Sequence, residues 1–212
     1  DGAFIILDAD TMEVEYEGRD SRQWISDVKF SPDGKTLAMG SHDDKIYLYD
    51  GKTFALRAKC EKHNSFITHM DFSTDSSYLQ SNCGAYELLY YNAMDGTFIS
   101  SASQLKDAQW ATWTCVLGWP VQGIWPDMED RDNTDVNACH RSNSGELLLC
   151  ADEKGRVKLF NYPCTKKGAG HASGVGHSAR VTNVRFDLND RFAFTVGGTD
   201  RCLFQWKLTE RK

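Results

Sequence analysis

The sequence predicts an all-β fold, on the strength of three observations. One phrase of short apolar segments and polar turns recurs along the 212 residues. Its copies, aligned on Phe30, Phe72, His140 and Phe186, follow one another at steps of 42, 68 and 46 residues. Apolar residues alternate within the segments, and no stretch has the period of a helix. A repeat of just over forty residues with four strands per unit is typical of a WD-repeat β-propeller. We therefore expect about four blades and a partial one.

The repeat boundaries divide the chain into five parts. Residues 3–8 match the end of the phrase, which predicts that the chain starts within a blade. The expected parts are a partial blade (1–20), a blade (21–62), a blade with an insertion (63–135, insertion 101–135), a blade (136–175) and a blade without its outer strand (176–212). Each blade of a propeller buries apolar surface only against its neighbours. We therefore expect the remaining blades of a larger ring to come from the parent chain or from a second molecule.

The first complete copy shows how one blade is encoded. Strands are expected near 24–30, 36–41 and 45–50. Val28 and Phe30 alternate with Lys29, which predicts that the two apolar side chains form the buried face of their strand. The segment Ser31–Gly34 reads as a tight turn, because its proline fixes φ and its glycine tolerates a positive φ.

Composition excludes several classes of partner. The net charge of −6 gives no basic surface for a nucleic acid or an anionic lipid. No apolar run is long enough to cross a bilayer, and the first residues do not form a signal peptide. The seven cysteines are an odd number, and several lie within apolar runs. We expect them to be reduced thiols that behave as small hydrophobic residues, with no disulfide among them.

The insertion is rich in tryptophan. The step between the second and third copies exceeds the first step by 26 residues, and no second turn-and-strand phrase fills the excess. The segment is therefore expected to decorate the propeller rather than form a further blade. Four tryptophans lie in it, of which most are expected to pack and one or two to bind a partner: Trp110, Trp113, Trp119 and Trp125. The acidic stretch 127–135 reads as a solvated loop that would repel an acidic partner.

WD repeats often join the strands of a blade through a polar network of His, Asp, Ser or Thr, and Trp. The last repeat holds His177, Asp200 and Trp206 at the usual offsets. The position four before the aspartate is Val196, which predicts an incomplete network. An acid–base pair of His177 and Asp200 is the functional alternative, but a general base needs a cleft and a third orienting group.

The earlier repeats carry weaker versions of this network. The second keeps His63 and Ser81 but has Ala85 where the aspartate belongs. The first keeps Asp43 but has Tyr49 in place of the tryptophan. We therefore expect the blades to be held mostly by packing.

Motifs for catalysis, metals and cofactors are not found. The Cys/His groupings are Cys60, His63 and His69, and Cys164, His171 and His177, and neither has the paired spacing of a tetrahedral site. The glycines of segment 168–176 precede a strand, whereas a phosphate-binding loop precedes a helix. No catalytic residue, metal or cofactor is predicted.

The segment Trp110–Pro126 resembles the echinoderm microtubule-associated protein-like family, as do Val157–Cys164 and the closing Gly197–Asp200 and Gln205–Leu208. The resemblance implies the later part of the second ring of a tandem propeller pair. It also implies a non-enzymatic scaffold of the cytoplasmic microtubule cytoskeleton that binds tubulin, microtubules or their regulators.

Two alternatives remain open at this point. One is a propeller enzyme or a small-molecule binder that uses the central channel. The other is a generic WD-repeat adaptor unrelated to microtubules, because propellers of this type bind very diverse partners. Ionisable groups that converge beside a closed pocket would favour the first alternative.

Overall fold

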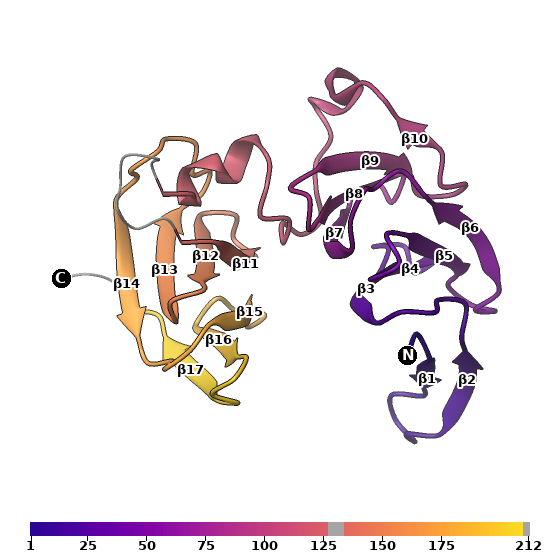
Figure 1. Ribbon diagram of the computed structural model, residues 1–212, viewed down its shortest axis with the longest axis horizontal. Helices are drawn as coiled ribbons and strands as arrows, with labels where there is room; N and C mark the ends of the chain where they lie inside the picture. Colours follow the sequence, from indigo (N-terminus) through magenta and orange to yellow (C-terminus); the bar gives the residue numbers. More distant parts are fainter. Residues whose placement is uncertain (127–133, 210–212) are drawn as a thin grey trace. The chain divides into compact units, whose positions relative to one another are not determined.

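The computed structural model describes residues 1–126 and 134–209, which form an all-β fold (Figure 1). The chain divides into two compact units, Asp1–Ala111 and Thr112–Lys212. All neighbouring strands within the sheets are antiparallel, as expected for propeller blades. No helix in the described ranges is both long enough and apolar enough to cross a membrane.

The first unit contains a two-stranded sheet and two four-stranded blades. The small sheet pairs β1 (Phe4–Leu7) with β2 (Val14–Gly18). The first blade has the order β3 (Ile25–Phe30), β4 (Thr36–Ser41), β5 (Ile46–Asp50) and β6 (Leu56–Cys60). The second has the order β7 (Ile67–Phe72), β8 (Tyr78–Cys83), β9 (Leu88–Asn92) and β10 (Phe98–Ile99).

The first blade is buried on both faces. On one face Ala38, Ile46 and Leu48 pack against residues of the second blade. On the other face Tyr47 and Tyr49 pack against the β1–β2 sheet. Burial of an apolar side chain of this size contributes roughly 1.5–3 kcal/mol. Stacking against neighbours is therefore what stabilises the blade.

The innermost strand of this blade corrects one expectation. Val28 and Phe30 are about half exposed, at 49% and 50%, whereas Lys29 points to the neighbouring blade. The reason is that Phe4 and Ile6 of the β1–β2 sheet pack on the cluster of β4 and β5. The face of β3 that carries Val28 and Phe30 is not covered in the same way.

The second unit contains one four-stranded blade and one three-stranded sheet. The blade has the order β11 (Val136–Arg141), β12 (Leu147–Asp152), β13 (Arg156–Asn161) and β14 (His171–Val175). The sheet has the order β15 (Val181–Phe186), β16 (Phe192–Gly197) and β17 (Leu203–Lys207). Leu149, Val157, Val184 and Phe186 belong to the core between them. Strand β17 is the edge of its sheet.

Strand register corrects the alignment of the third repeat. Phe30, Phe72 and Phe186 each end the first strand of a sheet and pair with the second residue of the next strand. In the third repeat Arg141 takes this place, and His140 lies one residue earlier. The alignment on His140 was wrong by one residue, because this copy has an arginine where the others have phenylalanine.

A left-handed residue closes the first turn of each of the four repeats. Gly34, Ser76, Gly145 and Asp190 have φ values of 70°, 64°, 74° and 54°. Each donates its N–H to the carbonyl of the residue three positions earlier. Glycine adopts this conformation freely, whereas serine and aspartate adopt it at a cost.

The described part of the insertion contains two short 3-10 helices, η1 (Ala102–Leu105) and η2 (Trp119–Ile124). Its one described strand-like contact is an isolated bridge between Ser73 and Trp110. Val121 and Ile124 of η2 are buried. Most of the acidic stretch predicted as a solvated loop lies outside the described residues. All seven cysteines are free thiols, six of them buried.

Candidate functional site

The last sheet carries a complete polar network. His177 Nδ1 lies 2.8 Å from Asp200 Oδ2, and His177 Nε2 lies 2.8 Å from Thr195 Oγ1. Trp206 Nε1 donates to the same Thr195 oxygen at 2.8 Å. The expectation of an incomplete network at Val196 is therefore wrong. The turn after β16 is one residue longer than the turn after β4, so the hydroxyl lies five positions before the aspartate.

This geometry makes the network structural. Both ring nitrogens of His177 are engaged, and its side chain is fully buried. The backbone N–H of Cys202, together with His177, holds the pKa of Asp200 below its usual range. His177 and Thr195 are both buried, and Thr195 Oγ1 also accepts the ring N–H of Trp206, so the described residues leave no cleft through which a substrate reaches the histidine and the acid–base alternative has no support here.

The second blade replaces the missing aspartate with another acid. His63 Nε2 lies 2.6 Å from Ser81 Oγ. Ala85 offers no carboxylate, but Glu87 Oε2 lies 3.4 Å from His63 Nδ1. Sequence reasoning missed Glu87 because it looked only at the usual offset. The available signal was that Glu87 is the sole acid between β8 and β9.

In the first blade, Asp43 binds hydroxyl groups instead of an imidazole. Ser21 Oγ donates to Asp43 Oδ2 at 3.1 Å, and Tyr47 donates to it at 2.6 Å. The hydroxyl oxygens of Ser21 and Ser41 lie 2.6 Å apart. Tyr49, at the tryptophan position, donates its hydroxyl to Asp20. This network is local to its own blade.

A main-chain hydrogen bond recurs in each of the four repeats. The residue before the innermost strand accepts, through its carbonyl, the N–H of a residue in the turn between the second and third strands. We call this bond the edge clamp. Its pairs are His42 to Trp24, Gly84 to Phe66, Glu153 to Asp135 and Gly198 to Arg180.

Two of these clamps present aromatic side chains to solvent. Trp24 is 68% exposed and Phe66 is 40% exposed. His42 stacks on Phe66 with ring centroids 4.7 Å apart. The ring centroids of Trp24 and His42 are 5.6 Å apart. We call Trp24, His42 and Phe66 the aromatic edge. The equivalent clamp positions of the second unit carry Asp135 and Arg180 instead.

The four tryptophans of the insertion differ in exposure. Trp110 and Trp113 are buried, and Trp125 donates its ring N–H to the carbonyl of Val116. Trp119 is 68% exposed. Of the predicted partner-binding tryptophans, Trp119 is therefore the one that presents most of its ring to solvent.

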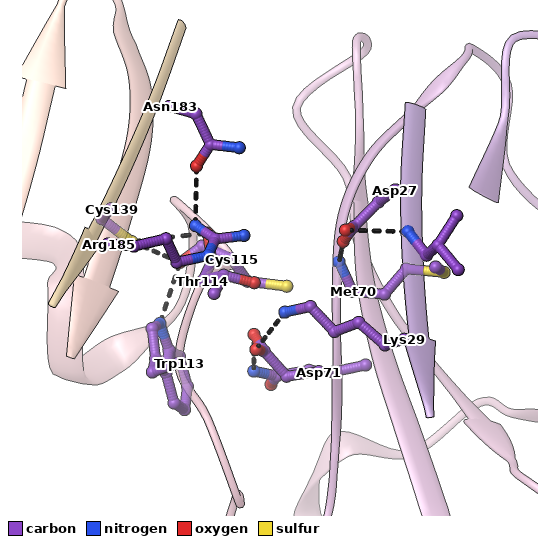
Figure 2. Close-up of polar contacts among 12 residues, drawn as sticks. Asp27, Lys29, Met70, Asp71, Trp113, Thr114, Cys115, Cys139, Asn183 and Arg185 are labelled. Carbon is purple, nitrogen blue, oxygen red and sulfur yellow. Dashed lines mark hydrogen bonds and ion pairs between the residues drawn. The ribbon is translucent and has the colours of Figure 1, made fainter. Parts of the chain in front are cut away.

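Charged groups on the innermost strands are paired (Figure 2). Lys29 Nζ lies 3.0 Å from Asp71 Oδ1, and the Asp71 side chain is fully buried. In the second unit Arg185 donates to the side chain of Asn183 at 2.7 Å. Lys29, Asp71 and Arg185 lie at equivalent positions, because each pairs with the third residue of the next strand. The Lys29–Asp71 pair joins two neighbouring blades, whereas the Arg185–Asn183 contact lies within one strand.

A cavity of about 780 Å³ lies in the second unit beside β13 and β14. Its walls include Leu147, Phe160 and Leu208, with His171 and Asp190 among the polar residues. Both carboxylate oxygens of Asp190 accept N–H groups of Asn143 and Ser144. The wall of this open groove is partly polar and partly apolar, and its carboxylate, Asp190, is already engaged by the neighbouring turn.

Comparison with known proteins agrees with the architecture. The chain is similar to the β-propeller domain of Cps50 (Swd1) from Myceliophteria thermophila, with a TM-score of 0.65 and 16% identity over 90% of this chain and 68% of that one. Fold, repeats and networks together define a WD-repeat β-propeller protein.

Sequence comparison gives the family. Residues 1–208 match the family described as the echinoderm microtubule-associated protein second beta-propeller, and the chain belongs to this family. It is 45% identical to rat echinoderm microtubule-associated protein-like 2 over 98% of this chain and 32% of the relative. It is 41% identical to human echinoderm microtubule-associated protein-like 4 over 99% of this chain and 22% of the relative. The chain thus spans about a third or less of these relatives.

Proposed function

We propose that the chain is a non-enzymatic interaction module of the cytoplasmic microtubule cytoskeleton, which binds tubulin, microtubules or their regulators. Family membership supports the proposal, because the relatives are named as microtubule-associated proteins. The mechanism is binding: blades hold loops at fixed spacing, and a partner docks on those loops.

The observation that carries the proposal is the aromatic edge. Trp24 and Phe66 are large, exposed and fixed at their backbone by edge clamps. Tryptophan is enriched at the energetic centres of protein interfaces, and a rigid anchor loses little entropy on binding. With a net charge of −6, contact with an acidic partner such as tubulin needs apolar anchors rather than charge attraction.

The test is co-sedimentation of the chain with taxane-stabilised microtubules and, separately, binding to free tubulin. W24A is compared with W119A, because both tryptophans are equally exposed. We expect W24A to weaken binding at least tenfold, since anchor truncation costs about 2 kcal/mol or more, and W119A to leave binding unchanged. The reverse result would make the insertion the docking element. Equal binding by W24A, W119A and the unaltered chain would contradict an aromatic anchor.

We also propose that further strands complete the last sheet, supplied by the parent chain or by a second molecule. Strand β17 is an edge strand, and Leu203 within it is exposed. Unpaired strand edges are sites at which another chain adds a strand.

A further inference from the structure

Three side chains of the second blade converge on one point. His63 lies in the loop before β7, Cys83 ends β8, and Glu87 precedes β9. One donor atom from each lies within 4.8 Å of the others. Glu87 Oε2 is 3.4 Å from His63 Nδ1 and 3.1 Å from Cys83 Sγ. Sequence spacing does not indicate this group, because its members come from three separate segments.

His63 Nδ1 is a buried polar atom without a hydrogen bond. The side chain is fully buried, and its other nitrogen is engaged by Ser81 at 2.6 Å. When Nε2 donates its proton to Ser81, the lone pair of Nδ1 faces the carboxylate of Glu87. Two lone pairs that face each other in a buried site repel, unless the imidazole proton lies on Nδ1 or a metal cation lies between them.

The last sheet provides an internal comparison. His177 occupies the equivalent place and reaches its acid at 2.8 Å, in a true hydrogen bond. The position corresponding to Cys83 is Gly197, by strand register. The second blade thus combines a longer histidine–carboxylate distance with an added sulfur ligand.

We propose that His63, Cys83 and Glu87 bind a divalent zinc ion. Zinc binds imidazole nitrogen, thiolate sulfur and carboxylate oxygen at about 2.0–2.3 Å, which places tetrahedral donors roughly 3.3–3.7 Å apart. The two measured separations lie within a few tenths of an ångström of that range. Binding replaces the thiol proton of Cys83, so one proton is released as the sulfur–zinc bond forms.

Neighbouring groups orient two of the three ligands. Ser81 holds the imidazole, and the backbone and side-chain N–H groups of Asn64 both donate to Glu87. Contacts of this kind orient metal ligands and set their basicity. The side chain of Glu87 is 26% exposed, so water can reach the site and supply a fourth ligand. The ion would tie the loop before β7 to the turn between β8 and β9.

The test uses the reduced, chelator-treated 212-residue chain titrated with zinc against a chromophoric chelator, and with cobalt as a spectroscopic probe. We expect one equivalent to bind, with a thiolate-to-cobalt charge-transfer band. C83S should abolish the band and weaken zinc affinity at least tenfold. C202S, which alters an exposed cysteine, is the matched control and should change neither.

E87Q gives a second variant, in case C83S does not fold. It keeps an oxygen acceptor for Asn64 but removes the charged ligand, so it should weaken zinc affinity while the zinc-free protein retains its β-sheet circular dichroism. Three results would overturn the proposal: no zinc bound at micromolar concentration, a cobalt band that persists in C83S, or unchanged affinity in a folded E87Q.

Discussion

At the residue scale, two histidines hold equivalent places in their blades but meet different acids. His177 completes a network with Thr195, Asp200 and Trp206, each contact being 2.8 Å. His63 has Ser81 on one side and a more distant carboxylate on the other. The same side chain therefore closes a network in one blade and leaves an unbonded nitrogen in another.

Thr195 is expected to be the most sensitive member of the complete network. T195V keeps the shape of the side chain but leaves the buried groups of His177 and Trp206 without their shared oxygen. An unsatisfied buried polar group costs about 1–3 kcal/mol, so the free energy of unfolding in urea should fall by at least that much. V196A, at the exposed neighbouring position, should change it by less than about 0.5 kcal/mol. Equal effects would contradict the network.

Glu87 should make stability depend on pH in the acid range. The N–H of Asn64 is the main cause that lowers its pKa from 4.5 to about 2. The ionised carboxylate therefore stabilises the folded state above pH 4.5, and this contribution is lost as the pH falls toward 2.

The measurement is urea unfolding over that range, with a chelator present to exclude metal. E87Q should lose less stability than the unaltered chain as the pH falls. E153Q, a control at an exposed glutamate, should follow the unaltered chain. If the free energy of unfolding of E87Q changed with pH as steeply as that of the unaltered chain, Glu87 would not be the titrating group.

The site could be predicted from sequence only in part. His177, Asp200 and Trp206 follow from fixed offsets, because the last repeat keeps the family spacing. Thr195 and Glu87 do not, because one turn is longer and one acid has moved by two positions. Offsets locate residues only while turn lengths stay constant.

At the element scale, the first turn of a repeat also joins neighbouring blades. Ser76 Oγ accepts the N–H of Asp33 from the preceding blade. In the second unit Asp190 accepts the N–H groups of Asn143 and Ser144. Ser76 and Asp190 are the non-glycine residues at the left-handed position of their turns. Their side chains offset the backbone cost with contacts that glycine cannot make.

D190G is predicted to destabilise the chain, although glycine relieves the left-handed strain. It removes several hydrogen bonds to a charged acceptor, and we expect a net loss of about 1 kcal/mol. D190N keeps one oxygen acceptor and should lose less. Thermal unfolding of both variants provides the measurement, and a more stable D190G would show that strain outweighs the contacts between the turns.

The strands themselves were largely predictable. Those expected near 24–30, 36–41 and 45–50 are Ile25–Phe30, Thr36–Ser41 and Ile46–Asp50. Alternating apolar residues and turn chemistry determine these elements locally. Which face of β3 is buried was not predictable, because burial depends on where the adjacent sheet packs. The predicted register of the third repeat was wrong by one residue, because Arg141 stands where the other repeats have phenylalanine.

At the scale of the whole molecule, each unit leaves apolar surface open to solvent. Val28 and Phe30 are half exposed in the first unit, and Val175 and Leu203 are more exposed in the second. Light scattering of the isolated chain should therefore show association that increases with concentration, accompanied by binding of a hydrophobic dye. A chain that stays monomeric and binds no dye at any concentration would contradict the proposal that further strands complete the last sheet.

The edge clamp has an evolutionary consequence. It is made by main-chain atoms, so the hydrogen bond that fixes each loop does not depend on which side chain the loop carries. Positions 24, 66, 135 and 180 hold tryptophan, phenylalanine, aspartate and arginine with the same bond in place. On the proposal that a partner docks at these positions, substitution there changes what a blade presents to the partner at little cost to folding. Single mutations would then alter binding while the blades beneath stay unaltered.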